Sequence, residues 1–151
     1  TINGKNEDAI KTIKSLTTNP AKRSFMGTPI AGADYAFDCI GLKQTMEQIV
    51  PAVKNGFFGA EPGGTAVLVG VPQTTVELNA ADILVNEKKF IGSIGGSCVP
   101  DRDFSKYLSW YDSGKLNLDD MVTERFTIDQ INEATKALEN GEISGRAILE
   151  F

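Results

Sequence analysis

The sequence predicts an α/β fold, part of a doubly wound (Rossmann-like), mainly parallel sheet with flanking helices. Short apolar segments at 34–41, 65–69 and 90–94 alternate with segments of helical periodicity. Strands that alternate with helices at this spacing form parallel sheets, because each helix returns the chain to the same end of the sheet. With 151 residues, of which 41% are hydrophobic, the chain is long enough for one globular domain with a sizeable core.

In the first part of the chain we expect a helix, a long loop and a strand. Apolar residues recur every three positions between about 7 and 16, which is the period of an amphipathic helix. Asn19 and Pro20 should end this helix, and residues 20–33, rich in glycine and proline, are expected to form a long and mobile loop. The mostly apolar segment 34–41 then predicts a strand.

The middle of the chain predicts a helix and two further strands. A broad apolar stripe from Thr45 to Val53 is helical, although Pro51 should kink or shorten the helix. The small, branched and apolar residues of 65–69 are typical of a parallel strand that is buried on both faces. Val76–Leu78 alternates apolar and polar residues, which predicts a short edge strand.

Three helices and a buried strand are predicted in the rest of the chain. Residues 80–87 form a short helix, and 90–94 form the strand. Apolar spacing over 104–111 is helical, and Gly114 follows where a glycine would end that helix. Thr127 is a favourable N-cap for the last helix.

The composition restricts the partners and the compartment. The formal net charge is −5 and the basic residues are not clustered, so the phosphate contacts of a nucleic-acid-binding protein are not expected. No apolar stretch approaches the roughly 20 residues of a membrane span, and the first residues do not resemble a signal peptide. We therefore expect a cytoplasmic protein without nucleic-acid or membrane partners. Cys39 and Cys98 are expected to be unpaired structural thiols.

Several segments resemble the zinc-type, medium-chain alcohol dehydrogenases. They are the strand-end segments 32–41, 63–72 and 91–96 and the closing segments 126–134 and 145–151. The resemblance implies that residues 1–151 are the C-terminal portion of a nicotinamide-dinucleotide-binding domain, together with the closing helix and strand of the chain. It also implies an oxidoreductase that transfers hydride between an alcohol or aldehyde and NAD or NADP.

The resemblance places the cofactor beyond the carboxyl ends of the strands, as in other doubly wound sheets. The resemblance assigns one role to each of the three tripeptides that follow the strands 34–41, 65–69 and 90–94. The tripeptide at the end of 34–41 would line the adenosine and ribose. The tripeptide at the end of 65–69 would pack against the nicotinamide ring, and the one at the end of 90–94 would offer backbone groups to the carboxamide of that ring. An arginine would bind the pyrophosphate through its planar guanidinium. Periodicity alone leaves open that the apolar members are only sheet core. In order, the residues are Cys39, Ile40 and Gly41; Val69, Gly70 and Val71; Ser93, Ile94 and Gly95; and Arg146.

Parts that the chemistry of the family needs are missing from this sequence. It has no histidine, so only its two cysteines could supply the nitrogen and sulfur ligands of a catalytic zinc. It also has no Gly-x-Gly-x-x-Gly loop followed by a helix, and no acidic residue about 20 positions after such a loop. We therefore expect that the first strand-loop-helix unit and the zinc site belong to upstream polypeptide. The chain alone should be inactive, and it does not distinguish NAD from NADP.

Two alternatives stay open at this point. A zinc-free quinone or enoyl reductase of the same superfamily would share the fold, although the C-terminal motif favours the zinc type. A stand-alone α/β module that dimerises or binds a partner would need no catalytic parts. By the resemblance, Val76–Leu78 pairs with its copy in a second subunit, which implies a homodimer; a capped edge facing water is the alternative.

Overall fold

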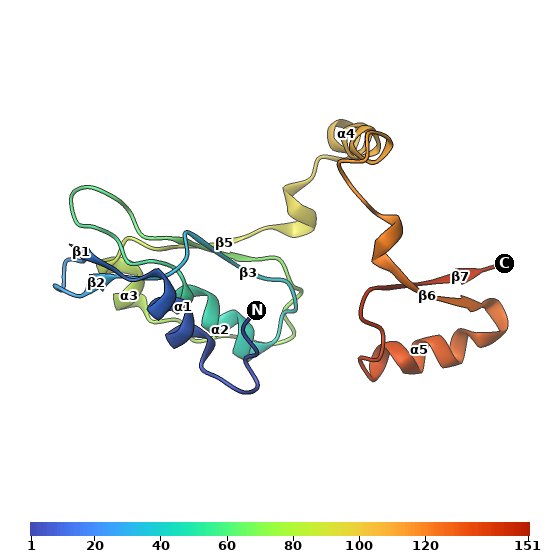
Figure 1. The fold of residues 1–151 in the computed structure, drawn as a ribbon, viewed down its shortest axis with the longest axis horizontal. Coiled ribbons are helices and arrows are strands. Elements are labelled where there is room, and N and C mark those ends of the chain that lie inside the picture. Colours follow the sequence, from blue (N-terminus) through green and yellow to red (C-terminus); the bar gives the residue numbers. More distant parts are fainter. The chain divides into compact units, whose positions relative to one another are not determined.

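A computed structural model describes all 151 residues, and they form two compact units. Unit 1 comprises Thr1–Ser97 and unit 2 comprises Cys98–Phe151. Each has its own parallel strands and helices, which Figure 1 shows in the colours of the sequence.

Unit 1 contains the parallel sheet that the sequence predicts. Its strand order is β3-β4-β5, and Tyr35, Thr65 and Lys89 lie side by side at its amino end. The strands are β3 (Tyr35–Asp38), β4 (Thr65–Leu68) and β5 (Lys89–Gly92). The helices are α1 (Ala9–Thr17), α2 (Lys43–Ala52) and α3 (Ala80–Val85). The three predicted strands are therefore confirmed, as is their parallel arrangement.

The core of unit 1 lies between α2 and one face of this sheet. Ile49, Val50 and Val53 pack against Ala66 of β4, and all four side chains are buried. Pro51 lies in the last turn of α2, so it shortens the helix rather than breaking it. The buried ammonium of Lys88 donates a hydrogen bond to the Val50 carbonyl at 3.2 Å and thereby satisfies one of the carbonyls at the end of the helix.

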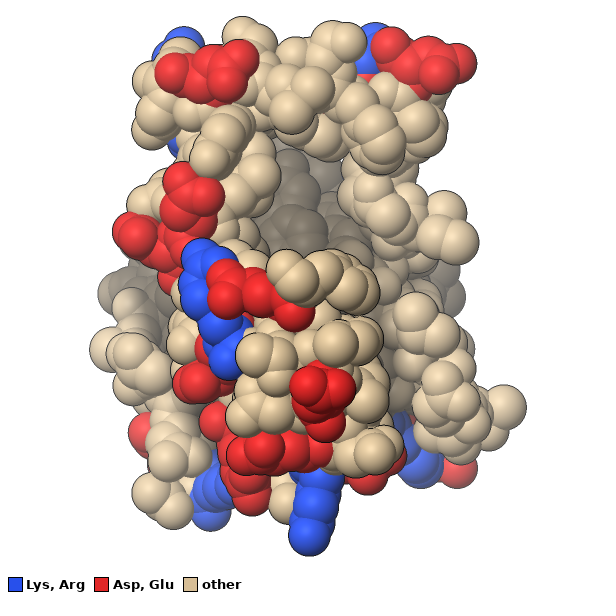
Figure 2. Space-filling model, turned by 90° about the vertical axis from the view of Figure 1, so that its right-hand side faces the viewer, with Lys and Arg blue, Asp and Glu red and all other residues tan.

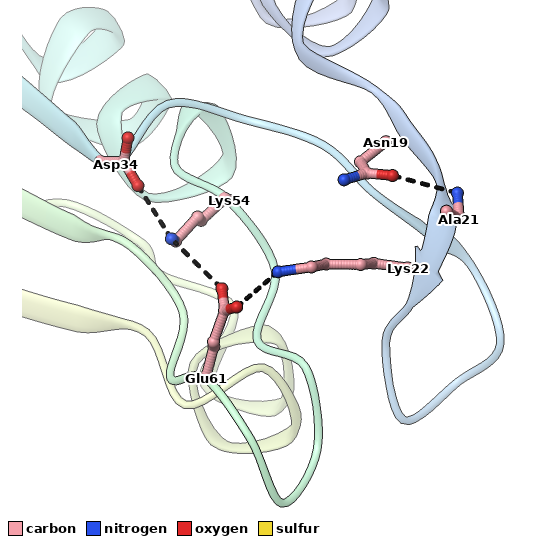
Figure 3. A network of polar contacts seen from close by, with 6 residues as sticks. All are labelled: Asn19, Ala21, Lys22, Asp34, Lys54 and Glu61. Carbon is pink, nitrogen blue, oxygen red and sulfur yellow. Dashed lines mark hydrogen bonds and ion pairs between the residues drawn. The ribbon is translucent and has the colours of Figure 1, made fainter.

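The prediction of a mobile loop at residues 20–33 is wrong, because these residues contain an antiparallel hairpin. It consists of β1 (Asn19–Arg23) and β2 (Pro29–Ile30). Lys22 of β1 forms an ion pair with Glu61, and Glu61 also approaches Lys54. Lys54 in turn binds Asp34, with 2.8 Å between Nζ and Oδ1 (Figure 3). The hairpin is thus tied to the loop that precedes β4.

The strand predicted at Val76–Leu78 is not formed within the chain. These residues pair with no other strand of unit 1. The backbone N–H of Glu77 instead donates to the Glu47 carboxylate of α2 at 2.9 Å. Pairing of this segment with a second copy is not tested by the single chain and stays a prediction.

Unit 2 contains two parallel strands and two helices. They are α4 (Pro100–Asp112), β6 (Val122–Thr127), α5 (Ile131–Glu139) and β7 (Arg146–Glu150), with β6 paired to β7. The sequence pattern did not predict β6, whose residues have no clear alternation. Helix α4 begins four residues before the predicted start, because Pro100 occupies a first-turn position and the Asp103 carboxylate accepts the Val99 N–H at 2.8 Å.

Three short 3-10 helices complete the chain, at Ile94–Ser97, Asp119–Met121 and Ile128–Gln130. None of the helices combines the length and the apolar composition that crossing a membrane requires. Figure 2 shows one face of the molecule, on which acidic side chains are scattered and Lys and Arg form no continuous patch. The absence of a nucleic-acid partner stays a prediction.

Candidate functional site

The three tripeptides predicted to contact a cofactor leave neighbouring strands at one end of the sheet in unit 1. Cys39–Gly41 follows β3, Val69–Val71 follows β4 and Ser93–Gly95 follows β5. Because the three strands are parallel and adjacent, the three turns lie next to one another at the carboxyl edge. The structure therefore brings together the nine candidate residues that belong to unit 1.

The first two turns are in direct backbone contact. Gly41 has φ +87°, and a Cβ added to it would lie 2.3 Å from the carbonyl oxygen of Val71. A Cβ added to Gly70 would lie 2.3 Å from the backbone nitrogen of Gly41. Each glycine is thus required by the approach of the opposite turn, and the two turns form one edge.

Asp38, the last residue of β3, joins these two turns. Its buried carboxylate accepts the Gly41 N–H at 2.8 Å and a hydrogen bond from the Thr45 hydroxyl. Its backbone carbonyl accepts the N–H groups of Val69 and Gly70, each at 2.9 Å. A buried carboxylate is stable only where such donors satisfy it, so Asp38 positions both turns.

The sequence alone does not reveal this role of Asp38. A carboxylate at the end of an apolar strand has no functional signature of its own. The signal that could have identified it is the spacing to Gly41 and to Thr45, which lies in the first turn of α2. That spacing lets one carboxylate bond both the turn and the helix.

Apolar side chains are exposed along this edge. Ile40 is 65% exposed, Val71 73% and Ile94 94%, one beyond each of the three strands. The alternative that Ile40 and Ile94 are only sheet core is therefore wrong, whereas Val69 is half-buried. Exposed apolar side chains on adjacent turns provide a surface on which a flat ring could pack.

The third turn is only partly free to bind a ligand through its backbone. The Ser93 N–H donates to the Leu68 carbonyl at 2.9 Å, and the Ser93 hydroxyl lies 3.0 Å from that of Ser97. Gly95 and Gly96 follow with φ +53° and +69°. Backbone donors for a ligand would therefore come from Ile94 onward rather than from Ser93.

Arg146 lies in unit 2, where it is the first residue of β7 and its side chain is exposed. Gly145 before it is packed closely, since an added Cβ would lie 2.5 Å from Thr123 Cγ2. Its assignment to the cofactor site rests on the family resemblance. Cys39 and Cys98 are free thiols in different units, and no group of three or more His, Cys, Asp or Glu residues could hold a metal ion.

Comparisons with known proteins agree on one family. The family model described as "Zinc-binding dehydrogenase" matches residues 1–113. The S-(hydroxymethyl)glutathione dehydrogenase of Paracoccus denitrificans is 29% identical over 143 residues, which are 93% of this chain and 35% of that enzyme. The chain thus spans about a third of the length of the curated relatives that it matches.

Two solved structures have the same fold. The benzyl alcohol dehydrogenase of Acinetobacter calcoaceticus matches with a TM-score of 0.76 and 25% identity, over 99% of this chain and 36% of that one. A zinc-binding dehydrogenase of Sinorhizobium meliloti 1021, solved with NADP bound, matches with a TM-score of 0.63 and 23% identity, over 98% and 36% of the two chains. The second likeness shows the fold alone.

Proposed function

The chain belongs to the zinc-binding dehydrogenase family, and we propose that it forms part of the cofactor-binding domain of an alcohol dehydrogenase. The observation that carries this proposal is the row of three adjacent turns at the carboxyl edge of the sheet, with exposed Ile40, Val71 and Ile94. Ligands of doubly wound sheets lie in the crevice at this edge. The whole enzyme would transfer hydride between a small alcohol or aldehyde and NAD or NADP.

The residues at this edge fit a nicotinamide dinucleotide. Exposed Val71 and half-buried Val69 offer apolar contact to the nicotinamide ring, and Ile40 with Gly41 would border the adenosine and ribose. Backbone groups from Ile94 onward would bind the carboxamide. Asp38 would hold the first two turns in place for these contacts.

Arg146 would bind the pyrophosphate, because a guanidinium can donate two parallel hydrogen bonds to phosphate oxygens. Zinc, when bound, would polarise the oxygen of the substrate. This chain has no histidine and no set of three metal-ligating side chains, so its residues do not fit a zinc site. We assign no step of the zinc chemistry to this chain.

Replacing Val71 by aspartate in an enzyme that contains the whole cofactor-binding domain tests the turn surface. The Val71 side chain is 73% exposed, so the fold should be unaffected. The Kd for NAD or NADP, measured by calorimetric titration, should rise about 10- to 150-fold, since an apolar contact worth about 1.5–3 kcal/mol is lost. Leu84→Asp, at an exposed position of α3, is the control and should leave the Kd unchanged. An unchanged Kd for Val71→Asp would contradict the proposal.

We also propose a homodimer that pairs Val76–Leu78 of two subunits. The Glu77 N–H is already bonded to Glu47, which leaves the backbone of Val76 and Leu78 for an external strand. A two-fold axis would let the same segment bond to itself. The compartment is proposed to be the cytoplasm.

Proline at Val76 or Leu78 would remove a donor from this pairing and should shift the enzyme toward monomer. Val76→Ala keeps the N–H and should sediment as the wild type does. Sedimentation velocity measures the effect. If both proline variants sediment as the wild-type assembly does, the subunits meet at another surface.

A further inference from the structure

One short segment joins the two contacts proposed above. The Val69–Val71 turn is expected to contact the nicotinamide ring, and Val76–Leu78 is expected to pair with a second subunit. Only residues 72–75 separate them in the sequence. These residues form neither a helix nor a strand, and all of them are exposed. A conformation of this segment that suits one contact therefore also affects the other.

The segment is held to the rest of unit 1 at few points. None of the residues from Val71 to Leu78 forms a backbone–backbone hydrogen bond. The Leu78 side chain packs against the buried core. One hydrogen bond, from the Glu77 N–H to the Glu47 carboxylate at 2.9 Å, ties the backbone to α2. A segment with so few bonds keeps much of its conformational freedom, so a ligand that fixes it must offset the entropy lost on ordering.

Glu47 is the anchor of this segment. It lies in the same helix as Thr45, whose hydroxyl donates to Asp38, the residue that joins the first two turns. Lys43, one helical turn earlier, forms an ion pair with the Glu47 carboxylate. The hydrogen bonds from Lys43 and from the Glu77 N–H lower the pKa of Glu47 from its ordinary 4.5, so a charged carboxylate accepts the N–H at neutral pH. Helix α2 is thus bonded both to the cofactor turns and to the segment that leads to the proposed interface.

We propose that residues 72–78 couple cofactor binding to dimer formation, with Glu47 as the positioning residue of the segment. A nicotinamide ring on Val71 fixes one end of the segment, and a partner strand on Val76–Leu78 fixes the other. The ligand that binds first orders part of the segment, so the second ligand binds more tightly. By linkage, the cofactor strengthens the dimer by the same factor by which dimerisation strengthens cofactor binding. The inference rests on the proposed function and on the proposed homodimer.

The coupling is measured in an enzyme that contains the whole cofactor-binding domain. Sedimentation equilibrium gives the dissociation constant of the dimer without cofactor and with saturating NAD or NADP. We expect the cofactor to lower this constant by about 5- to 150-fold, which is the usual range for coupled sites. Calorimetric titration at protein concentrations below and above the dissociation constant of the dimer should give the same factor in the Kd for the cofactor.

Two glycines inserted between Gln73 and Thr74 should uncouple the contacts, because a longer flexible connection lets each end be fixed independently of the other. The enzyme should still bind the cofactor and still dimerise, and the coupling factor should fall below about twofold. The same insertion after Gly59, in the exposed loop before β4, is the matched control and should leave the coupling factor unchanged.

Glu47→Ala releases the Glu77 N–H and leaves the free segment less ordered. Cofactor binding and dimer formation should both weaken, although Glu47 belongs to neither proposed contact. The coupling factor should rise above that of the wild type, because more of the segment remains to be ordered by the first ligand. Glu47→Gln keeps an oxygen acceptor for the N–H and should restore the wild-type values. Glu139→Ala, at an exposed glutamate of α5, is the control and should change neither constant.

Several results would overturn the inference. The dissociation constant of the wild-type dimer could be independent of the cofactor, or the glycine insertion could leave the coupling factor unchanged. Glu47→Ala could behave as Glu139→Ala does, which would remove the role of Glu47. A dimer that forms through another surface, as the proline variants would show, also overturns it. None of these results contradicts the proposed cofactor site, which fails only if the enzyme binds no cofactor there.

Discussion

Unit 1 and unit 2 differ in how much apolar surface they bury. Every buried hydrophobic residue of the chain lies in unit 1 except Ala134 of α5. In unit 2, α4 leaves Phe104, Leu108 and Tyr111 exposed although their spacing is that of an amphipathic helix. The apolar pattern of a helix therefore specifies which side must be covered, but it does not show that the same unit provides the cover.

The helices and strands of unit 2 are instead stabilised by local hydrogen bonds. Asp103 accepts the Val99 N–H at the start of α4, and Thr127 with Gln130 forms a capping box before α5. Such bonds fix the ends of helices but contribute less than a core does. We therefore expect unit 1 to unfold as a cooperative core and unit 2 to be less stable by itself.

The largest expected effect comes from the core of unit 1. Met46→Ala removes a side chain that is 1% exposed and should lower the free energy of unfolding of unit 1 by about 2–5 kcal/mol. Hydrogen exchange of the β4 amides would measure it. Trp110, the one tryptophan of the chain, lies in unit 2, so its fluorescence follows the unfolding of that unit. The midpoint of this fluorescence transition should not change.

Met121→Ala in unit 2 is the matched control, because Met121 is 48% exposed and truncation of this side chain should change stability far less than Met46→Ala does. If Met46→Ala destabilises both the unfolding transition seen by Trp110 fluorescence and the β4 amides seen by hydrogen exchange, the two units unfold together. That result would remove the contrast between them.

The interlocked turns of unit 1 give the next effect. Gly70→Ala would bring a Cβ to 2.3 Å from the Gly41 nitrogen, and forcing the two turns apart should destabilise unit 1 by about 1–3 kcal/mol. Gly92→Ala is the control, since no heavy atom lies within 4 Å of an added Cβ there and its φ is not left-handed. Denaturation followed by circular dichroism would measure both. Equal stability of the two variants would show that the turns are separable.

The smallest expected effect is the response of the hairpin to acid. Lys54 lowers the pKa of Asp34 from its ordinary 3.8, and Lys22 lowers the pKa of Glu61 from 4.5. A carboxylate with a lowered pKa in the folded state contributes stability above its ordinary pKa and loses it as the pH falls through the lowered value. Backbone NMR shifts of the hairpin should therefore be constant from pH 8 to about 5 and change below about 4.

Lys22→Met should bring the hairpin shifts at neutral pH close to those of the acid form, because it removes the partner of Glu61. The exposed Lys11→Met of α1 should leave the acid response as it is. High salt should weaken the response, since these pairs are near the surface. If the hairpin shifts stay unchanged after both carboxyl groups have become protonated, the ion pairs do not hold the hairpin.

The sequence alone predicted the elements whose residues carry a strong period. Strands β3, β4 and β5, helices α1, α2 and α5, and the positions of the three turns are all marked by apolar spacing and glycine. The family resemblance added the candidate residues on those turns. These predictions succeeded because burial on one or both faces determines which positions along a strand or helix are apolar.

Only the tertiary structure decided the features that depend on partners distant in sequence. The β1–β2 hairpin has no apolar period, and its ion pair joins Lys22 to Glu61, 39 residues away. Asp38 became the link between two turns because parallel pairing puts its carbonyl opposite Val69 and Gly70. A local pattern states that a surface is apolar, and only the packed arrangement shows whether anything lies against it.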